Sequence, residues 1–417
     1  MMKLIKRFPL LLFFLLINGQ PDTLTIMNYN ILRFNGNSSQ RAEYIKTVID
    51  YVKPDLIVLE EIEDQSGINL LLNDFLNKDS EVFSAGPLPN SQWMKSGIIY
   101  NKSKLDLTSY KFIPTVLRDI SGYTLSIKNA HENVSPFTVF GAHLKASNGS
   151  YESEQRWKEA KELHKYISQM NSDYHYILAG DFNVYGPDEP AYKLLVDSMS
   201  IDLEDPIGYW SRNESSHVEK YTQSTRNDQL SDGGASGGLD DRFDFILFSD
   251  HFTSKDPDLK YVEGSYKVIG NDGNHFNKSI TDGANSVVSA SIAEAIYFGS
   301  DHYPVVAKVI FTGKNSTSPV AHAGGDQVAA IDDIVYLNGS ESYDPNGSII
   351  NYEWSQTSGP KVNIENSQLV KANFVVPQIN RTTSFIFRLK ITDNENETSM
   401  DYVKIRVPIV GGYTPYN

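Results

Sequence analysis

The 417-residue sequence contains no cysteine. This absence excludes disulfide scaffolds, thiol nucleophiles, cysteine-ligated zinc and iron–sulfur clusters. Any metal that the protein uses must therefore be bound through oxygen or imidazole ligands. Basic residues are also scarce, since 37 Lys and Arg stand against 52 Asp and Glu, for a net charge of −15. A generally basic surface for nucleic-acid binding is excluded, because non-specific affinity comes from Lys and Arg that neutralise phosphates.

The N-terminus lacks an apolar run long enough to cross a membrane. The stretch Phe8–Ile17 has ten residues, whereas a spanning helix needs about eighteen. It follows Lys3, Lys6 and Arg7, and a basic start before a short apolar stretch is typical of a secretory signal. We therefore predict a signal peptide over residues 1–19 and a secreted or cell-surface protein without stable membrane insertion. The alternative, a buried N-terminal strand, is disfavoured by the basic start.

The composition predicts a folded chain of more than one domain. Hydrophobic residues make up 40% and aromatic residues 12% of the sequence, which is ample for a buried core. A polar segment at residues 313–319, rich in Gly, Ser and Thr, separates two regions of different character. Residues 22–312 mix helical and strand patterns, whereas residues 320–410 contain short β-like segments between turn residues, as in a β-sandwich. Residues 318–417 carry a net charge of −4, which leaves −11 of the total on residues 1–317.

In the first domain, apolar segments repeatedly run into polar residues. Strands that are buried on both faces read as continuous apolar runs, and catalytic groups collect at their carboxyl ends. The polar residues at or near these segment ends are Asn30, Glu61, His143, Asp181, Asn183, Asp244, Asp301 and His302. Strand ends that point the same way would bring these side chains into one site.

The same residues occur in characteristic motifs, in a characteristic order. The motifs are Asn30, Leu59-Glu60-Glu61-Ile62, Ala142-His143-Leu144-Lys145, Gly180-Asp181-Phe182-Asn183, Arg242-Phe243-Asp244-Phe245 and Ser300-Asp301-His302. Residues 22–311 thereby resemble the endonuclease/exonuclease/phosphatase superfamily, the deoxyribonuclease I-like fold. The resemblance implies a four-layer α/β sandwich, followed here by an all-β immunoglobulin-like sandwich. It also implies a hydrolase that acts on phosphoric ester bonds.

The resemblance implies a divalent-metal site. Glu61 and Asn30 would bind the cation, and Asp301 would contribute to that site or lie beside it. Hard oxygen ligands suit Mg²⁺, with Mn²⁺ or Ca²⁺ as alternatives. Glu60 and Glu61 point to opposite faces of a strand, so only one of them can reach the metal. The family places the ligand at the second position, which is Glu61.

The resemblance also assigns groups to the attacking water. Asp244 and His302 match the family's acid–imidazole pair, in which the carboxylate orients the ring while the ring takes a proton from water. Asp181 and Asn183 would hold that water and a phosphate oxygen. A lone motif of this kind would be weak, but all six occur in order. An inert protein that retains the fold is the alternative.

Two more residues are expected to contact the phosphate. His143 would bind the phosphate or the leaving group, and Arg118 matches a phosphate-contacting arginine of the family more loosely. The glycine-rich segment Gly233–Gly238 could suggest a phosphate cradle, but a cradle needs a helix behind it. A strand pattern, Phe243–Phe248, follows instead. We therefore expect this segment to be a flexible loop.

The substrate prediction rests on smaller departures from the family pattern. Leu32 stands where abasic-site endonucleases have a second acid, which argues against that repair role. The segment Gly180–Pro190 resembles the secreted bacterial nucleases of the superfamily and favours nucleic acid as the substrate. A lipid phosphodiesterase of the sphingomyelinase kind on the same site, and an inert surface-binding protein, remain open alternatives.

The second domain resembles the polycystic-kidney-disease (PKD) type of immunoglobulin-like module. The resemblance lies in Ala323–Gln327, Asp344–Gly347 and Tyr352–Trp354. Trp354 is expected in the core. Such modules act as spacers or bind protein or carbohydrate, and we expect a monomer. No clustered acid, histidine or nucleophile predicts a second active site there.

Overall fold

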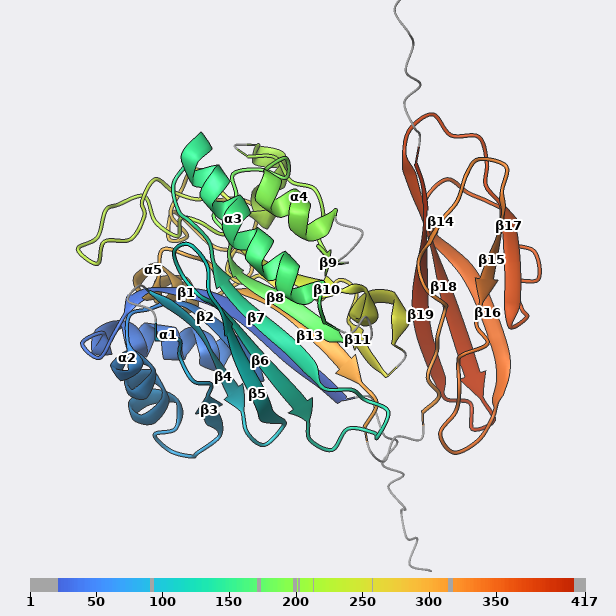
Figure 1. Cartoon of the computed structure of the whole chain (residues 1–417), viewed down its shortest axis with the longest axis horizontal. Helices are drawn as coiled ribbons and strands as arrows, with labels where there is room; N and C mark the ends of the chain where they lie inside the picture. Colours follow the sequence, from blue (N-terminus) through green and yellow to red (C-terminus); the bar gives the residue numbers. More distant parts are fainter. Residues whose placement is uncertain are drawn as a thin grey trace, which may run out of the picture.

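The computed structural model describes residues 22–90, 94–170, 174–197, 201, 203–212, 214–256, 258–313 and 318–408. The predicted signal peptide and residues 314–317 of the predicted linker lie outside these ranges, and the predicted domain boundaries stay a prediction. The first domain contains two β-sheets that face each other (Figure 1). Their facing side chains form a continuous apolar layer that includes Leu24, Val58, Val139 and Ile246. The two sheets form the inner layers of this domain.

One inner sheet has its main strands in the order β11, β13, β1, β2, β4 and β3, with β12 paired to β13. Their bounds are β1 Asp22–Phe34, β2 Leu56–Ile62, β3 Phe83–Ala85, β4 Lys95–Asn101, β11 Leu259–Tyr261, β12 Lys267–Val268 and β13 Val305–Phe311. Helices α1 (Ser39–Val52) and α5 (Ala290–Gly299) and the short α2 (Gln65–Asn69) and η1 (Leu70–Leu76) cover its outer face. The face of α1 that carries Ala42, Ile45, Val48 and Ile49 is buried, as its 3.6-residue spacing predicts.

The other inner sheet has the strand order β5, β6, β7, β8, β10 and β9. Their bounds are β5 Leu105–Ile113, β6 Ile120–Ile127, β7 Phe137–His143, β8 His175–Asp181, β9 Leu203–Glu204 and β10 Asp244–Ser249. Helices α3 (Ser150–Ile167) and α4 (Pro190–Val196) cover the outer face of this sheet. The short helices η2 (Ser215–Lys220) and η3 (His251–Lys255) lie in the connections. Helix layers outside both sheets complete the four-layer α/β sandwich that the sequence predicts.

The second domain is an all-β sandwich, as predicted. A four-stranded sheet has the order β14, β19, β18, β16, and β15 pairs with β17. Their bounds are β14 Gln327–Val328, β15 Ile334–Asn338, β16 Ile349–Ser358, β17 Lys371–Val375, β18 Thr383–Asp393 and β19 Thr398–Val407. Trp354 is buried in the core between these sheets.

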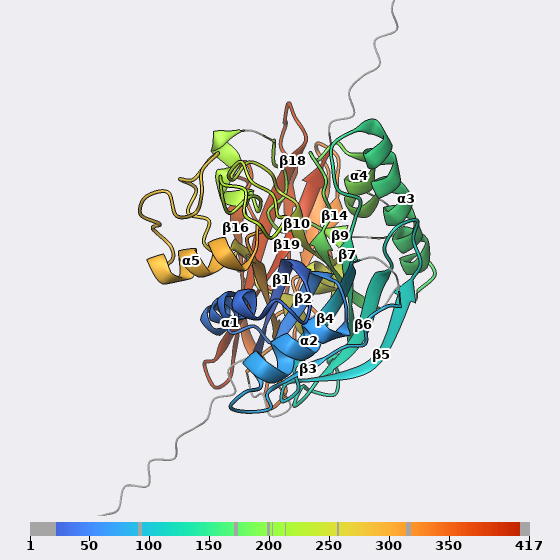
Figure 2. The same ribbon diagram turned by 90° about the vertical axis from the view of Figure 1, so that its left-hand side faces the viewer.

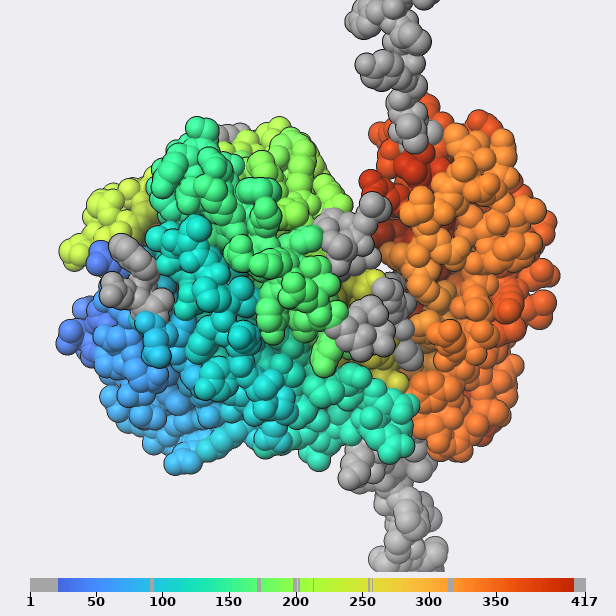
Figure 3. Space-filling view, viewed as in Figure 1, coloured from blue at the N-terminus to red at the C-terminus, as the bar shows by residue number. Residues whose placement is uncertain are grey.

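The two domains meet at one end of the first domain. Asp22 at the start of β1 pairs with Phe311 at the end of β13, and the second domain packs near this end. The polar contacts between the domains include the ion pair of Lys260 with Asp401 at 2.9 Å, that of Lys404 with Glu204 at 3.4 Å and a hydrogen bond from the Tyr343 hydroxyl to Asp258. A hollow of about 510 Å³ lies between the domains, and Figure 3 shows them as separate masses.

Strand direction places the predicted site far from this interface. Asn30 lies eight residues along β1 from Asp22, which at about 3.3 Å per residue is about 26 Å. Figure 2 views the molecule from that far end, with the second domain behind the first. Among the described residues, no helix combines the length and apolar character needed to cross a membrane.

Candidate active site

The predicted site residues converge because of how the strands pair. β7 and β8 run parallel, with His143 opposite Asp181, and β1 and β2 run parallel, with Asn30 opposite Glu60. β10 is antiparallel to β8, so Asp244 at its start lies opposite Asp181 at the end of β8. β13 is antiparallel to β1, which brings the residues before β13 to the same edge. The two sheets therefore deliver their polar termini to one end of the sandwich.

Asn30 connects two carboxylates at the centre of the site. Its Nδ2 lies 3.3 Å from Glu61 Oε1 and 3.0 Å from Asp181 Oδ2. Its Oδ1 accepts a hydrogen bond from the Leu32 amide at 3.0 Å. The other carboxylate oxygen of Glu61 accepts from the amide of Arg33 at 3.0 Å. The geometry shows Asn30 as a bridge between acids, and its role as a metal ligand stays a prediction.

Glu61, His143 and Asp181 form a group that could hold a metal ion. One ligand atom from each lies within 4.8 Å of the others, and this is the group of that kind found among the described residues. His143 Nε2 lies 3.5 Å from Asp181 Oδ2 and 4.0 Å from Glu61 Oε1. The sequence predicts Glu61 as a ligand but gives His143 and Asp181 other roles.

The electrostatics of this group fit a divalent cation. Burial raises the pKa of Glu61, and burial together with nearby carboxylates raises the pKa of Asp181 to about 7. Burial lowers the pKa of His143 well below its usual 6.5, and Arg118 and His302 lower it further. His143 is therefore neutral, which is the form that binds metals. Two crowded carboxylates and a neutral imidazole are a donor set that a bound cation would stabilise.

The predicted acid–imidazole pair is present and buried. His302 Nδ1 lies 2.7 Å from Asp244 Oδ2, and His302 Nε2 lies 3.7 Å from Asp181 Oδ2. Burial lowers the pKa of His302, but Asp244, Asp181 and Asp301 outweigh it, and the net shift is well above 6.5. The charged form of the ring is thus strongly supported, as a group that accepts a proton in the reaction requires.

Asp301 lies beside the metal-binding group. Its Oδ2 accepts hydrogen bonds from the Ala235 amide at 2.6 Å and from Gln223 Nε2 at 3.2 Å. Those bonds occupy the oxygen with protein donors. The geometry favours a position next to the metal-binding group, and direct ligation by Asp301 stays a prediction.

Asn183 and Arg118 lie next to these groups. The Asn183 amide donates to Asp181 Oδ1 at 3.0 Å, and its side chain contacts the Leu144 carbonyl at 3.4 Å. Arg118 Nη1 donates to the carbonyls of His143 and Leu144 at 3.3 and 3.2 Å. Its buried Nε has no hydrogen-bond partner among the described residues. Phosphate contacts by Asn183, His143 and Arg118 stay predictions.

The sequence reasoning missed a segment that joins the two halves of the site. Thr222 Oγ1 accepts the amides of Phe243 and Asp244 at 3.0 and 3.1 Å. The Thr222 carbonyl accepts the Tyr303 amide at 2.7 Å. Gln223, the next residue, contacts both Asp301 and His302. No motif marks this segment, because its role depends on contacts with residues 20 to 80 positions away.

The glycine-rich segment is anchored to the site, whereas the sequence predicted a flexible loop. The buried Arg226 forms an ion pair with Asp232 at 2.9 Å, and the Ala235 amide bonds Asp301. A Cβ atom on Gly234 would lie 2.3 Å from Arg226 Nη2 and 3.0 Å from Asp301 Cγ. Glycine is therefore needed at 234 for the loop to approach Asp301.

Glu60 lies on the opposite face of β2 from Glu61, as the alternation of a strand predicts. Its side chain is 0% exposed, and neither carboxyl oxygen has a hydrogen-bond partner among the described residues. Burial raises its pKa well above 4.5, and the charges of Asp244 and Asp181 add to the shift. Glu60 is thus a buried acid beneath the site that favours its neutral form.

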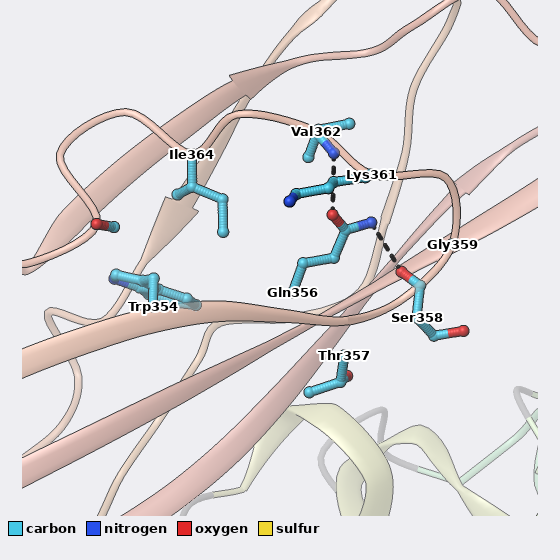
Figure 4. Close-up of a pocket in the computed structure, with 9 residues that line it drawn as sticks. Trp354, Gln356, Thr357, Ser358, Gly359, Lys361, Val362 and Ile364 are labelled. Carbon is cyan, nitrogen blue, oxygen red and sulfur yellow. Dashed lines mark hydrogen bonds between the residues drawn. The ribbon is translucent and has the colours of Figure 1, made fainter.

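A separate hollow lies in the second domain (Figure 4). It measures about 420 Å³, and its lining includes Trp354 and Gln356. The Gln356 side chain accepts the Val362 amide at 3.0 Å and donates to the carbonyls of Ser358 and Pro360 at 3.0 and 2.8 Å. These bonds are internal, so Gln356 serves to hold the loop that forms the hollow.

Comparisons with known proteins agree with both domains. The model of the Endonuclease/Exonuclease/phosphatase family matches residues 27–302, and that of a PKD domain matches residues 323–407. No protein of curated function matches the chain.

Solved structures that resemble the chain share little sequence with it. D. rerio TDP2 with a single-strand DNA product is 15% identical, covers 69% of this chain and 99% of its own, and has a TM-score of 0.46. The human nocturnin catalytic domain with a bound sulfate is 18% identical, covers 70% and 98%, and scores 0.44. An endonuclease/exonuclease/phosphatase from Bacteroides vulgatus is 13% identical, covers 70% and 99%, and scores 0.45.

Proposed function

The chain belongs to the Endonuclease/Exonuclease/phosphatase family, and on that premise we propose that it is a secreted, divalent-metal-dependent phosphodiesterase whose substrate is nucleic acid. Members of this family hydrolyse phosphoric esters, and the chain is a hydrolase of this class. The finer assignments, to a metal, to nucleic acid and to secretion, are our proposal.

One observation carries the proposal. The group Glu61, His143 and Asp181 lies directly beside the pair Asp244 and His302, since His302 Nε2 is 3.7 Å from the same Asp181 oxygen that lies 3.5 Å from His143 Nε2. A cation-binding group and a proton-accepting group therefore share one edge of the sandwich. Hydrolysis of a phosphodiester needs both functions at one phosphorus atom.

The donor set favours particular ions. Glu61 and Asp181 offer oxygen atoms, which suit Mg²⁺, and His143 offers a nitrogen that Mn²⁺ accepts more readily. Ca²⁺, which prefers oxygen ligands, fits this set less well. A bound divalent cation would offset the negative charge that develops on the phosphoryl oxygens.

The protein's own groups then act on the water and the phosphate. His302 takes a proton from the attacking water at Nε2, while Asp244 holds Nδ1–H and stabilises the resulting cation. Asn183 and Arg118 are placed to donate hydrogen bonds to phosphate oxygens, which steadies the diester in line for attack. The fold, the buried pair and the local cations thus support phosphodiester hydrolysis without a generally basic surface.

Nucleic acid and secretion rest on sequence features. Residues 180–190 resemble secreted bacterial nucleases, and the basic and apolar N-terminus is typical of a secretory signal. The PKD-type module would then bind protein or carbohydrate at the cell surface or act as a spacer.

An activity panel tests the proposal. Purified protein is assayed on DNA, RNA, sphingomyelin and a simple soluble phosphodiester, each with Mg²⁺, with Mn²⁺ and with excess chelator. We expect hydrolysis of nucleic acid that requires the cation. Preference for sphingomyelin would favour the lipid phosphodiesterase, and no hydrolysis of any substrate would favour an inert binding protein.

A matched pair of variants tests the metal group. Glu61→Gln removes one ligand charge and should lower turnover by about 100-fold or more while raising the cation concentration required. Glu43→Gln, on the exposed face of α1, makes the same chemical change away from the site and should leave both unchanged. Full activity of Glu61→Gln, or of the parent protein in excess chelator, would contradict the proposed metal dependence.

A further inference from the structure

Gln223 occupies a constrained position between two walls of the site. It is half-buried, and it follows η2 and precedes the glycine-rich loop. Its amide donates to the Asp241 carbonyl at 3.0 Å, and its carbonyl accepts the amides of Asp240 and Asp241 at 3.0 and 3.1 Å. A second backbone bridge pairs Gln223 with His302. The main chain therefore fixes where the carboxamide can reach.

The carboxamide contacts two site residues through one atom. Gln223 Nε2 lies 2.7 Å from His302 Nε2 and 3.2 Å from Asp301 Oδ2. An amide NH₂ group has two hydrogens to donate, and a carboxylate oxygen can only accept. Asp301 therefore turns the NH₂ end of the carboxamide toward itself, and the second hydrogen points at His302 Nε2.

This arrangement selects one tautomer of the neutral ring. If Nε2 accepts from Gln223, the ring proton is on Nδ1, where it donates to Asp244 Oδ2 at 2.7 Å. The competing arrangement would place the proton on Nε2, facing Asp181 Oδ2 at 3.7 Å. That tautomer has no lone pair at Nε2 and could not take a proton from water there.

We propose that Gln223 is a positioning residue that couples Asp301 to His302 and keeps the lone pair of His302 Nε2 directed into the cleft. The attacking water takes the place of the Gln223 N–H at Nε2, while the carboxamide keeps its bond to Asp301. The proposal rests on the proposed phosphodiesterase function, since it concerns the group that activates water in that reaction.

Two variants of similar size separate hydrogen bonding from packing. Gln223→Met keeps the side-chain length and removes both donors, and should lower kcat by about 10- to 100-fold, the usual effect of removing a supporting hydrogen bond around a metal-dependent site. KM should change by less than about threefold, because the carboxamide does not hold the substrate. Gln223→Glu should lower kcat further, because its carboxylate opposes Asp301 and favours a proton on His302 Nε2.

A control variant makes the same change elsewhere. Gln378 in the second domain donates to both oxygens of the Asp332 carboxylate at 3.1 and 3.0 Å. Gln378→Met therefore removes an equivalent glutamine–aspartate contact and should leave kcat and KM unchanged. Thermal unfolding and circular dichroism of each variant check the fold. If Gln223→Met does not fold, Gln223→Asn is used, because it keeps the donors but is one methylene too short to contact both partners.

A spectroscopic readout tests the position of the ring proton directly. The imidazole nitrogens are observed by ¹⁵N NMR at a pH above the pKa of His302, with the signals assigned by comparison with His302→Phe. We expect the Nδ1–H tautomer in the parent protein and a shift toward Nε2–H in Gln223→Met. Unchanged kcat, or an unchanged tautomer in the variant, would overturn the proposal.

The two hypotheses fail in different ways. If the parent protein hydrolyses none of the phosphodiesters, the proposed function fails, while the NMR comparison still decides whether Gln223 sets the tautomer. If the parent protein is active and Gln223→Met has the parent kcat, the proposed function stands and the role of Gln223 is refuted.

Discussion

Replacing Glu60 with Gln should make the first domain more stable at neutral pH. Glu60 is fully buried without a hydrogen-bond partner among the described residues, and burial raises its pKa well above 4.5. The unfolded chain releases this proton near pH 4.5, whereas the folded protein retains it to a higher pH. The folded state therefore binds more protons, and the stability of the parent protein falls as the pH rises above 4.5 toward the folded pKa. Glu60→Gln removes this loss because the amide does not ionise.

The size of the effect follows from the proton linkage. One proton retained on folding costs up to about 1.4 kcal/mol for each pH unit. From pH 5 to pH 7 the free energy of unfolding of the parent protein should therefore fall by up to about 2.7 kcal/mol relative to Glu60→Gln. At roughly 2 °C per kcal/mol for a large domain, the difference in Tm should grow by about 5 °C.

The assay is unfolding by urea and by heat between pH 5 and pH 8, in the presence of a chelator. Glu43→Gln, on the exposed face of α1, is the matched control and should follow the parent protein at every pH. The reasoning is refuted if the stability difference between the parent protein and Glu60→Gln does not change with pH. It is also refuted if the parent protein gains stability relative to the variant as the pH rises.

Three further changes test other parts of the structure. Asp244→Ala and His302→Ala should each lower turnover by about 100-fold or more, and the double variant should be little worse than His302→Ala, because the acid acts only through the ring; multiplying losses in steady-state assays would contradict this. Gly234→Ala should lower both Tm and turnover, because the added Cβ displaces the loop that holds Asp301; a crystal structure and kinetics with unchanged values would count against the close approach. Deletion of residues 318–417 should preserve turnover on a small soluble phosphodiester, since the module packs at the end of the first domain opposite the site, and loss of turnover by a truncated protein that stays folded would argue otherwise.

Regular elements of both domains could be predicted because their signals are local. The spacing of Ala42, Ile45, Val48 and Ile49 indicates a helix with one buried face, and α1 has that face. Continuous apolar segments such as residues 176–180 indicate strands buried on both faces, and β8 is fully buried. The convergence of the polar strand ends then follows from strand direction.

The parts of the site that could not be predicted depend on long-range contacts. Gln223 reaches Asp301 and His302 across about 80 residues, and no local spacing reports such a contact. The prediction of a flexible glycine-rich segment used the absence of a helix behind it and could not include the Asp301 oxygen that accepts the Ala235 amide. The role of His143 beside Glu61 likewise depends on how the two sheets face each other.

The ion pairs between the domains have a consequence for multivalent binding. Lys260 is largely buried against Asp401, and Lys404 lies between Glu204 and Asp326. Two sites on a docked pair of domains have a set separation and direction, unlike two sites joined by a flexible chain. The effective concentration of a substrate tethered to any surface that the module holds is then high only for segments that can reach around to the opposite end of the enzyme. A polymer held by the module would have to be long and bendable to be cut by the same molecule, whereas neighbouring polymers that face the open end would be cut directly.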